Sequence, residues 1–195
     1  MKITTLGFAI ALLLIGCQKT LTEKQADFGE GQFTPAYVQE WFNNNFVHST
    51  EYTAYDSTKY GAKRVDWKKG LYRRSGNAEL VSFPLIKGRR QTISSAIDTT
   101  ISKAQFQKTL EASFTRVLFS KNSKNEISVR VLDYVPEYSY LQSKNFSRAL
   151  VEADVNSNSG KFSGSVSAKK WSGQPLSVAK FKNGKIIKAP YTSYR

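Results

Sequence analysis

Residues 158–187 read NSGKFSGSVSAKKWSGQPLSVAKFKNGKII, and this stretch alternates short apolar runs with turn-forming residues. The turn signals are Asn158-Ser159-Gly160, Ser172-Gly173 and Asn183-Gly184, and the runs between them are Phe162–Trp171, Leu176–Phe181 and Ile186-Ile187. Asn-Gly between apolar runs is a strong hairpin signal, because both central residues of the turn take a positive φ. The stretch therefore predicts three consecutive antiparallel strands.

Further short strands are expected before this region. They are Leu80–Ile86, Ser113–Phe119, an alternation at Ile127, Val129 and Val131, and an alternation at Ala149, Val151, Ala153 and Val155. Alternation of apolar and polar residues is typical of a strand with one buried face. Five or six strands in hairpin-linked order predict an antiparallel meander.

One helix is expected ahead of the strands, at residues 35–46. Thr34 is a candidate N-cap, Pro35 suits the first helical position, and the aromatic residues that follow have helical spacing. We expect this helix to pack on the sheet, which gives an α+β fold class. Residues 48–77 are interpreted as a long surface segment, and residues 91–112 are ambiguous, with a helix-like pattern from Ser102 to Glu111.

The N-terminus carries a targeting signal. Met1-Lys2 gives a positive start, an apolar run follows, and the chain's one cysteine ends the sequence Leu14-Ile15-Gly16-Cys17. The run is too short to span a bilayer and is typical of a signal peptide. The tetrapeptide resembles the lipobox of bacterial lipoproteins, in which the cysteine sulfur accepts a lipid and cleavage occurs before the cysteine. The alternative is a plain secretory signal with a chance cysteine.

These signals divide the chain into three parts. We expect a lipoprotein signal peptide at residues 1–16, a flexible tether at 17–33 that begins with a lipidated Cys17, and a single α+β domain at 34–195. A chain of 195 residues suits one such domain.

The composition excludes several classes of protein. With one Cys and one His, the chain has no disulfide framework, no multi-Cys zinc site and no centre that needs two imidazoles. With 40% apolar residues it is not a disordered tract, although its net charge is +14. We predict no catalytic residue, no metal and no cofactor.

Positive charge is concentrated in two segments. Residues 61–90 hold nine basic and two acidic residues, and residues 161–195 hold eight basic residues and no acidic one. The candidate anion-binding residues are Lys63, Arg64, Lys68, Lys69, Arg73, Arg74, Arg89, Arg90, Lys169 and Lys170, and the candidate aromatic contacts are Trp67, Tyr72 and Trp171. Cationic patches attract anionic polymers, and aromatic rings beside them can stack on sugars or bases. The alternative is a solvated basic face with no specific ligand.

Catalytic constellations are weak in this sequence. His48 is not accompanied by a Gly-x-Ser-x-Gly elbow, and a lipidated Cys17 is no nucleophile. Glu137, Glu152 and Asp154 are the candidates for a glycosidase-like carboxylate pair. We interpret Glu152 and Asp154 instead as the solvated face of a strand.

Several motifs occur in an order that resembles a group of uncharacterised lipoproteins from Bacteroidota. They are the lipobox, Gln39-Glu40-Trp41, Val65–Lys69, Val81–Leu85, Phe162–Val166 and Trp171-Ser172-Gly173. The resemblance covers most of the mature chain and implies a periplasmic or outer-membrane location without an established activity. Gln18-Lys19-Thr20 lacks the acidic cluster of surface-export signals in this phylum, which favours the periplasmic face of the outer membrane.

Two tripeptides, Asp56-Ser57-Thr58 and Asp98-Thr99-Thr100, are similar to the Asp-(Ser/Thr)-Xaa sites that Bacteroidota O-glycosylate. Both lie in segments that we expect to be exposed. Ser57 and Thr99 are therefore candidate O-glycosylation sites.

The sequence favours a lipid-anchored envelope protein that binds anionic glycans or lipid head groups without catalysis, and nucleic acid is not an expected partner. One alternative is an accessory subunit or inhibitor that docks on an envelope protein. The other is a hydrolase that acts on envelope glycans.

Overall fold

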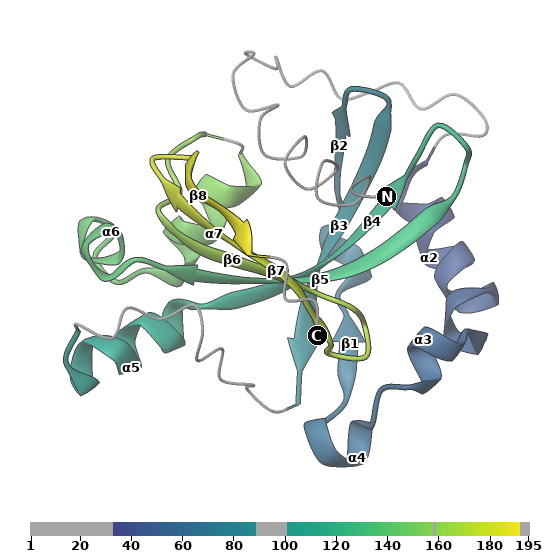
Figure 1. Ribbon diagram of the computed structural model, residues 1–195, viewed down its shortest axis with the longest axis horizontal. Coiled ribbons are helices and arrows are strands. Elements are labelled where there is room, and N and C mark those ends of the chain that lie inside the picture. The colour runs from purple at the N-terminus through teal and green to yellow at the C-terminus, as the bar shows by residue number, and fades with distance from the viewer. Residues whose placement is uncertain (1–32, 89–100, 158, 192–195) are drawn as a thin grey trace.

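Eight antiparallel strands form one sheet in the computed structural model, which describes residues 33–88, 101–157 and 159–191 (Figure 1). The strands are β1 (Lys63–Val65), β2 (Leu71–Ser75), β3 (Ala78–Lys87), β4 (Phe114–Lys121), β5 (Ile127–Pro136), β6 (Gly164–Lys169), β7 (Pro175–Lys182) and β8 (Lys185–Tyr191). Their order is β1-β3-β4-β5-β6-β7-β8, with β2 also paired to β3. The α+β class is confirmed. The expectation of five to six strands is too low, because β1 and β2 lie within residues 48–77, where polar side chains obscure any alternation.

The strand β3 carries two partners along one edge. β2 pairs with its first half and β1 with its second half, so Lys63 lies directly opposite Lys87. Between β2 and β1 the chain forms the short 3-10 helix η3 (Trp67–Lys69), which Asp66 begins by accepting a hydrogen bond from the Lys68 N–H at 3.3 Å. This split edge brings two lysines together at one end of the sheet.

The helices are α2 (Pro35–Asn44), η2 (Phe46–His48), α3 (Thr50–Thr53), α4 (Ser57–Tyr60), α5 (Lys103–Ala112), α6 (Tyr138–Ser143) and α7 (Arg148–Asn156). The expected first helix is present as α2, and the Thr34 hydroxyl accepts a hydrogen bond from the Tyr37 N–H at 3.1 Å, as an N-cap should. The helix-like pattern after residue 102 corresponds to α5, which a capping box between Ser102 and Gln105 begins.

The strand expected at residues 149–155 is wrong, since this segment forms α7. The Ser147 hydroxyl accepts a hydrogen bond from the Leu150 N–H and begins the helix, which signals a helix rather than a strand. Val151 and Val155 are four residues apart, so they share a helix face and pack in the same cluster. The strand was predicted because apolar residues occupy alternate positions over residues 149–155, and a segment this short fits a helix equally well.

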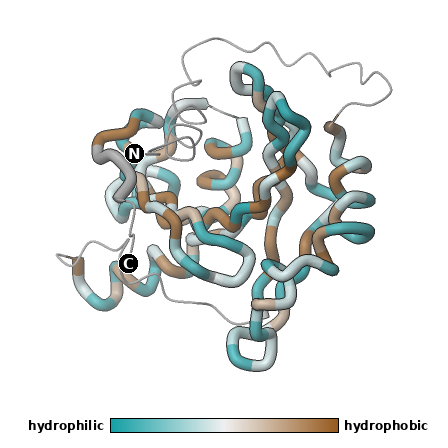
Figure 2. Tube along the Cα trace, turned by 45° about the vertical axis from the view of Figure 1, so that its right-hand side comes forward, coloured by the Kyte–Doolittle hydropathy of each residue, from teal (hydrophilic) through white to brown (hydrophobic). Residues whose placement is uncertain are grey.

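The first core lies between the segment α2–α3 and one face of β3, β4 and β5. Phe42 and Phe119 are its aromatic centre, with ring centroids 6.0 Å apart and in edge contact. Trp67 packs on Phe83 at 4.8 Å, and Trp171 from the chain after β6 joins the same cluster. The buried aromatic residues of the first helix are thus part of the core. Figure 2 shows that apolar stretches gather in the middle of the sheet, while the hairpin ends are mostly hydrophilic.

A second core lies on the opposite face of the sheet, under α6 and α7. Leu141 and Val151 are fully buried there, against Phe114 of β4 and Phe181 of β7. The expectation of one helix on one face is therefore too simple. The sheet is covered by different helices on its two faces, because successive strand residues alternate in direction and both sides carry apolar rows.

The predicted Asn-Gly hairpin is confirmed between β7 and β8. Asn183 and Gly184 have φ values of 48° and 70°, the left-handed pair that this turn requires. Gly184 is also in close contact with another loop, because a Cβ added there would lie 2.4 Å from the Gly160 carbonyl oxygen.

The variant Gly184→Ala is expected to lower the free energy of unfolding by more than about 1 kcal/mol, since it adds a clash to an unfavourable φ. Gly76→Ala is the matched control, because Gly76 has a φ of 57° and no atom near its added Cβ. Urea denaturation of both variants measures the difference. Equal losses in the two variants would show that the contact with Gly160 contributes nothing.

Candidate anion-binding site

Charged side chains occupy core-facing positions at one end of the first core. On β3, Phe83 and Leu85 face that core, and Lys87 is the next residue on the same face. On β5, Val131 faces the core and Asp133 follows on its face. Burying a charged side chain is costly unless it is paired. Charged residues at positions where the strand pattern predicts apolar ones therefore indicate a role other than core packing.

Asp133 is the acceptor at the centre of this group. Its Oδ1 lies 2.6 Å from Lys87 Nζ and accepts a hydrogen bond of 2.6 Å from the Thr115 hydroxyl, while its Oδ2 lies 3.1 Å from Lys169 Nζ. The side chains of Lys87, Lys169 and Asp133 are 11%, 13% and 5% exposed. Burial alone would raise the pKa of Asp133, but the ammonium groups of Lys87 and Lys169 outweigh burial and hold this pKa below its usual range.

Lys63 of β1 adds a third ammonium group beside Lys87. Its Nζ donates a hydrogen bond to the Trp171 carbonyl oxygen and lies 3.5 Å from the centre of the Tyr55 ring. The Glu51 carboxylate fixes this loop by accepting a hydrogen bond of 2.9 Å from the Trp171 N–H. The aromatic rings and the carbonyl hold the ammonium group at the edge of the first core.

Burial and the neighbouring ammonium group of Lys87 lower the pKa of Lys63 to about 7. The negative charges of Asp133 and Glu51 oppose this effect, and Lys169 adds to it. We call Lys63, Lys87, Lys169 and Asp133 the lysine centre. Lys87 and Lys169 pair with one central carboxylate and Lys63 lies beside Lys87, so positive charge is in excess even when Lys63 is neutral and increases when Lys63 is protonated.

An unpaired hydroxyl lies beside the lysine centre. Ser167 of β6 is directly opposite Asp133 in the β5–β6 ladder and therefore on the same face of the sheet. Its side chain is buried, and its Oγ has no hydrogen-bond partner in the part of the chain that the structure describes. A buried hydroxyl without a partner is costly, and an anion at the lysine centre would supply the missing acceptor.

The lysine centre can bind an anionic group by charge and hydrogen bonding. Lysine ammonium groups are point charges with three donors each, and they suit phosphate, sulfate and carboxylate oxygens alike. The partly buried position strengthens the attraction, because the effective dielectric constant is lower than in water.

Of the predicted anion-binding residues, the structure brings Lys63 and Lys169 together. Arg64, Lys68, Lys69 and Arg74 are exposed, and Lys170 is half-buried at the start of the β6–β7 turn. Arg89, Arg90, Cys17 and Thr99 lie outside the described residues. Ser57 is exposed at the start of α4, where the Asp56 side chain accepts hydrogen bonds from Thr58 and Lys59.

The predicted aromatic contacts differ in exposure, since Trp171 is buried whereas Trp67 and Tyr72 are partly exposed. Trp171 is 2% exposed and belongs to the first core, and Trp67 and Tyr72 are partly buried against the same cluster. The Tyr72 hydroxyl donates a hydrogen bond to Glu79 at 3.2 Å. The rings of Trp67 and Trp171 contact other aromatic rings of the first core.

Arg73 contacts the end of a helix of the same chain. Its Nη2 donates hydrogen bonds of 2.6 and 2.8 Å to the carbonyl oxygens of Val155 and Asn156, at the C-terminus of α7. Arg116 of β4 donates to the Asn156 side chain at 3.1 Å. A basic side chain at a helix C-terminus satisfies its free carbonyl groups, which is the role of Arg73 here, while Arg116 joins the Asn156 side chain to Ser82 of β3.

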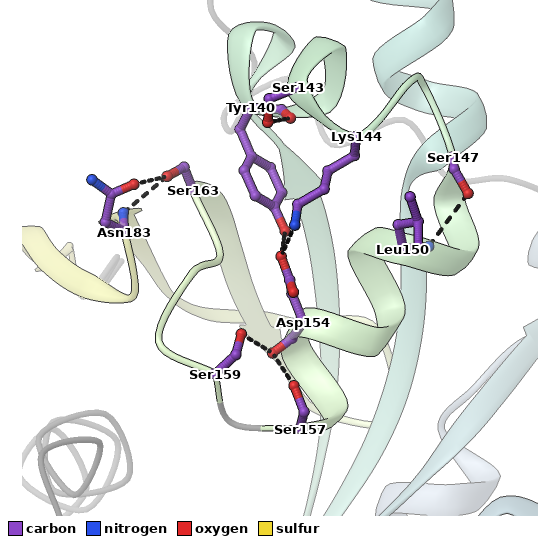
Figure 3. Close-up of polar contacts among 10 residues, drawn as sticks. All are labelled: Tyr140, Ser143, Lys144, Ser147, Leu150, Asp154, Ser157, Ser159, Ser163 and Asn183. Atoms are coloured by element: carbon purple, nitrogen blue, oxygen red, sulfur yellow. Dashed lines mark hydrogen bonds and ion pairs between the residues drawn. The ribbon is translucent and has the colours of Figure 1, made fainter.

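The carboxylates considered for catalysis also hold helices in place. Asp154 belongs to α7 and contacts α6, because it accepts a hydrogen bond of 2.8 Å from the Tyr140 hydroxyl and pairs with Lys144 at 2.6 Å (Figure 3). Burial and the Asp154 carboxylate raise the pKa of Tyr140 well above its ordinary value. Glu152 pairs with Arg148 on the same helix, and Glu137 pairs with Lys182. Since residues 149–155 are helical, Glu152 and Asp154 do not share one face of a strand.

His48 is exposed at the end of η2. Within the described ranges, no group of three His, Cys, Asp or Glu side chains could hold a metal ion. None of the helices in the same ranges is long and apolar enough to cross a membrane.

Sequence reasoning missed Lys87, Thr115, Asp133 and Ser167 as site residues. A signal for two of them was present, since Lys87 follows Phe83 and Leu85 at alternate positions and Asp133 follows Val131 in the same way. A charged residue at the end of an apolar alternation marks a buried polar group. The pattern does not show which strands are neighbours in the sheet. It therefore cannot predict that these four residues lie close together.

Comparison with known proteins finds no matching protein-family model, no matching curated protein and no matching solved structure. The geometry of the lysine centre is therefore the basis for assigning a function.

Proposed function

We propose that this chain is a non-enzymatic, lipid-anchored protein of the cell envelope that binds anionic groups of envelope glycans or lipids at the lysine centre. The observation that carries the proposal is that Lys87 and Lys169 share a single carboxylate, Asp133, while a third amine, Lys63, lies close enough for their charges to affect it. An excess of partly buried positive charge is unfavourable for folding, and a bound anion would relieve it.

The envelope location rests on the N-terminal sequence. Lipidation at Cys17 and cleavage before it would anchor the domain to a membrane, and the sequence after Cys17 favours the periplasmic face of the outer membrane. Phosphate and carboxylate groups are abundant on the polymers and lipids near such an anchor. Since Trp171 is buried and Trp67 and Tyr72 are partly buried, we propose binding through lysines rather than through ring stacking.

A titration with inorganic sulfate tests the lysine centre directly, because sulfate keeps its charge across the neutral pH range. Lys63 with a pKa of about 7 carries a proton below neutral pH and loses it above. We therefore expect sulfate to bind more tightly at about pH 6 than at about pH 8. If sulfate raises the pKa of Lys63 by one unit, the affinities at these two pH values differ about fivefold.

The variant Lys63→Gln is expected to lower the affinity and to remove its pH dependence. Lys124→Gln is the matched control, because Lys124 is exposed in the β4–β5 turn and has no acidic partner in the described structure. Calorimetry of the three proteins measures both effects. Sulfate binding that is the same in Lys63→Gln and in the wild type would reject the lysine centre as the site.

A pull-down at two salt concentrations then tests the envelope ligand. Retention on peptidoglycan or lipopolysaccharide that is lost at high salt supports binding through charge, since salt screens exposed charges over roughly 8–10 Å. Capture of one envelope protein that survives high salt would instead favour an accessory subunit.

A further inference from the structure

Lysines lie directly opposite each other in the hairpin of β7 and β8. The ladder pairs Lys182 with Lys185 and Lys180 with Lys188. Directly opposite residues in an antiparallel pair have Cβ atoms about 4.5–5.5 Å apart, and like charges in that position are destabilising. The Lys182–Lys185 pair is therefore an unfavourable arrangement for the isolated protein.

The acidic residues needed to neutralise these pairs are scarce. Lys182 has an ion pair with Glu137 at 2.9 Å, whereas Lys180 and Lys185 are exposed and have no ion pair in the part of the chain described here. The whole segment 161–195 contains no acidic residue. The hairpin therefore presents positive charge that the described structure does not balance.

The hairpin lysines face the same side of the sheet as the lysine centre. Lys180 is directly opposite Ser165 of β6, and Ser165, Ser167 and Lys169 are at alternate positions of that strand. Ser167 in turn is directly opposite Asp133. Residues that are paired or two apart along a strand share one face, so the pairings connect the two groups of positive charge.

The separation of the two groups exceeds the size of one small anion. Lys169 is paired with Pro175 of β7, and Lys180 is five residues further along that strand, which at about 3.3 Å per residue is roughly 17 Å. A single phosphate or sulfate can occupy the lysine centre or the hairpin, but it cannot reach both.

We infer that the ligand is a linear polyanion with repeated phosphate or carboxylate groups, which enters the lysine centre with one group and lies along the β7–β8 hairpin with the groups that follow. This inference rests on the proposed function and adds the length and repeating charge of the ligand. Lys180, Lys182 and Lys185 form the second contact region.

Edge-strand lysines also have a simpler explanation, because they prevent a free sheet edge from pairing with another chain. That explanation predicts that the lysines can be replaced without any effect on ligand binding. It also predicts that their neutral variants self-associate. The two explanations therefore differ in a measurable way.

The test uses the full chain, purified in a non-ionic detergent. The hairpin variant is Lys180→Gln with Lys185→Gln, and the control variant is Lys103→Gln with Lys124→Gln, which removes the same charge from two other exposed sites. Calorimetry measures binding of inorganic sulfate, long-chain polyphosphate and polygalacturonate at several salt concentrations. The last two probes distinguish phosphate from carboxylate polymers.

We expect the hairpin variant to bind sulfate like the wild type and to lose about tenfold or more in affinity for one or both polymers. Loss of two contacts should also reduce the slope of log affinity against log salt by about 1.4, if each contact releases counterions as on a flexible single strand. The control variant should retain both the polymer affinity and the slope. This combination supports the inference.

Two results would overturn it. Unchanged polymer binding in the hairpin variant, with or without self-association measured by light scattering, would leave the edge-protection explanation. Equal losses in the hairpin and control variants would show that polymers respond to net charge alone. Failure of the proposed function is recognised separately, because wild-type protein would then not bind sulfate in a manner that depends on Lys63.

Discussion

Asp133→Asn is expected to lower the free energy of unfolding by about 3–5 kcal/mol, the usual loss when one partner of a buried ion pair is removed. Lys87 and Lys169 would lose their common carboxylate, from which they lie 2.6 and 3.1 Å away. With Lys63 nearby, positive charge would remain without compensation. The substitution keeps the shape of the side chain, so the loss reports on charge rather than on packing.

Urea denaturation of Asp133→Asn and of a control variant, Glu152→Gln, measures this loss. Glu152 pairs with Arg148 on an exposed helix face, so its replacement should cost less than about 1 kcal/mol. Millimolar sulfate should restore more stability to Asp133→Asn than to the wild type, because the anion takes the position of the missing charge. Equal stability in the two variants would mean that the central carboxylate does not hold the lysines in place.

Phe119→Ala is expected to lower the free energy of unfolding by about 3–5 kcal/mol, the range for removing a buried aromatic ring. Phe119 is 0% exposed, and its ring lies within 6.4 Å of the rings of Trp41, Phe42, Trp67 and Phe83. These rings come from α2, η3 and β3, so the cavity would loosen three elements at once.

The matched control for this variant is Leu150→Ala. Leu150 is 48% exposed on α7, and its truncation should change stability by no more than about 0.5 kcal/mol. Thermal and urea denaturation of both variants give the comparison. A loss below about 1 kcal/mol for Phe119→Ala would show that the aromatic cluster is not a packed core.

The sequence predicted the second half of the sheet well, and local chemistry explains why. Asn183-Gly184 specifies its own turn, so β7 and β8 follow from two residues and their neighbours. In contrast, α7 was predicted as a strand, because seven residues with alternate Val and Ala fit both periods. The N-cap at Ser147 could have decided between them.

The candidate site was predicted only in part. The clustering of lysines in the sequence pointed to positive charge, and it included Lys63 and Lys169. The convergence of these two with Lys87 and Asp133 depends on β1 lying beside β3 and β5 lying beside β6. Such long-range pairings are set by the packing of both cores, and no local pattern encodes them.

The bonds from Arg73 to α7 bear on the order in which the chain can assemble. The β2–β3 hairpin and the β4–β5 hairpin join neighbouring segments, whereas Arg73 contacts the carbonyl groups of Val155 and Asn156 across 82 and 83 residues of chain. Closing so long a loop costs conformational entropy that local hairpins do not pay. During synthesis, the N-terminal half of the sheet can form before α7 has been synthesised. The hydrogen bonds of Arg73 form only after the C-terminal end of α7 has folded.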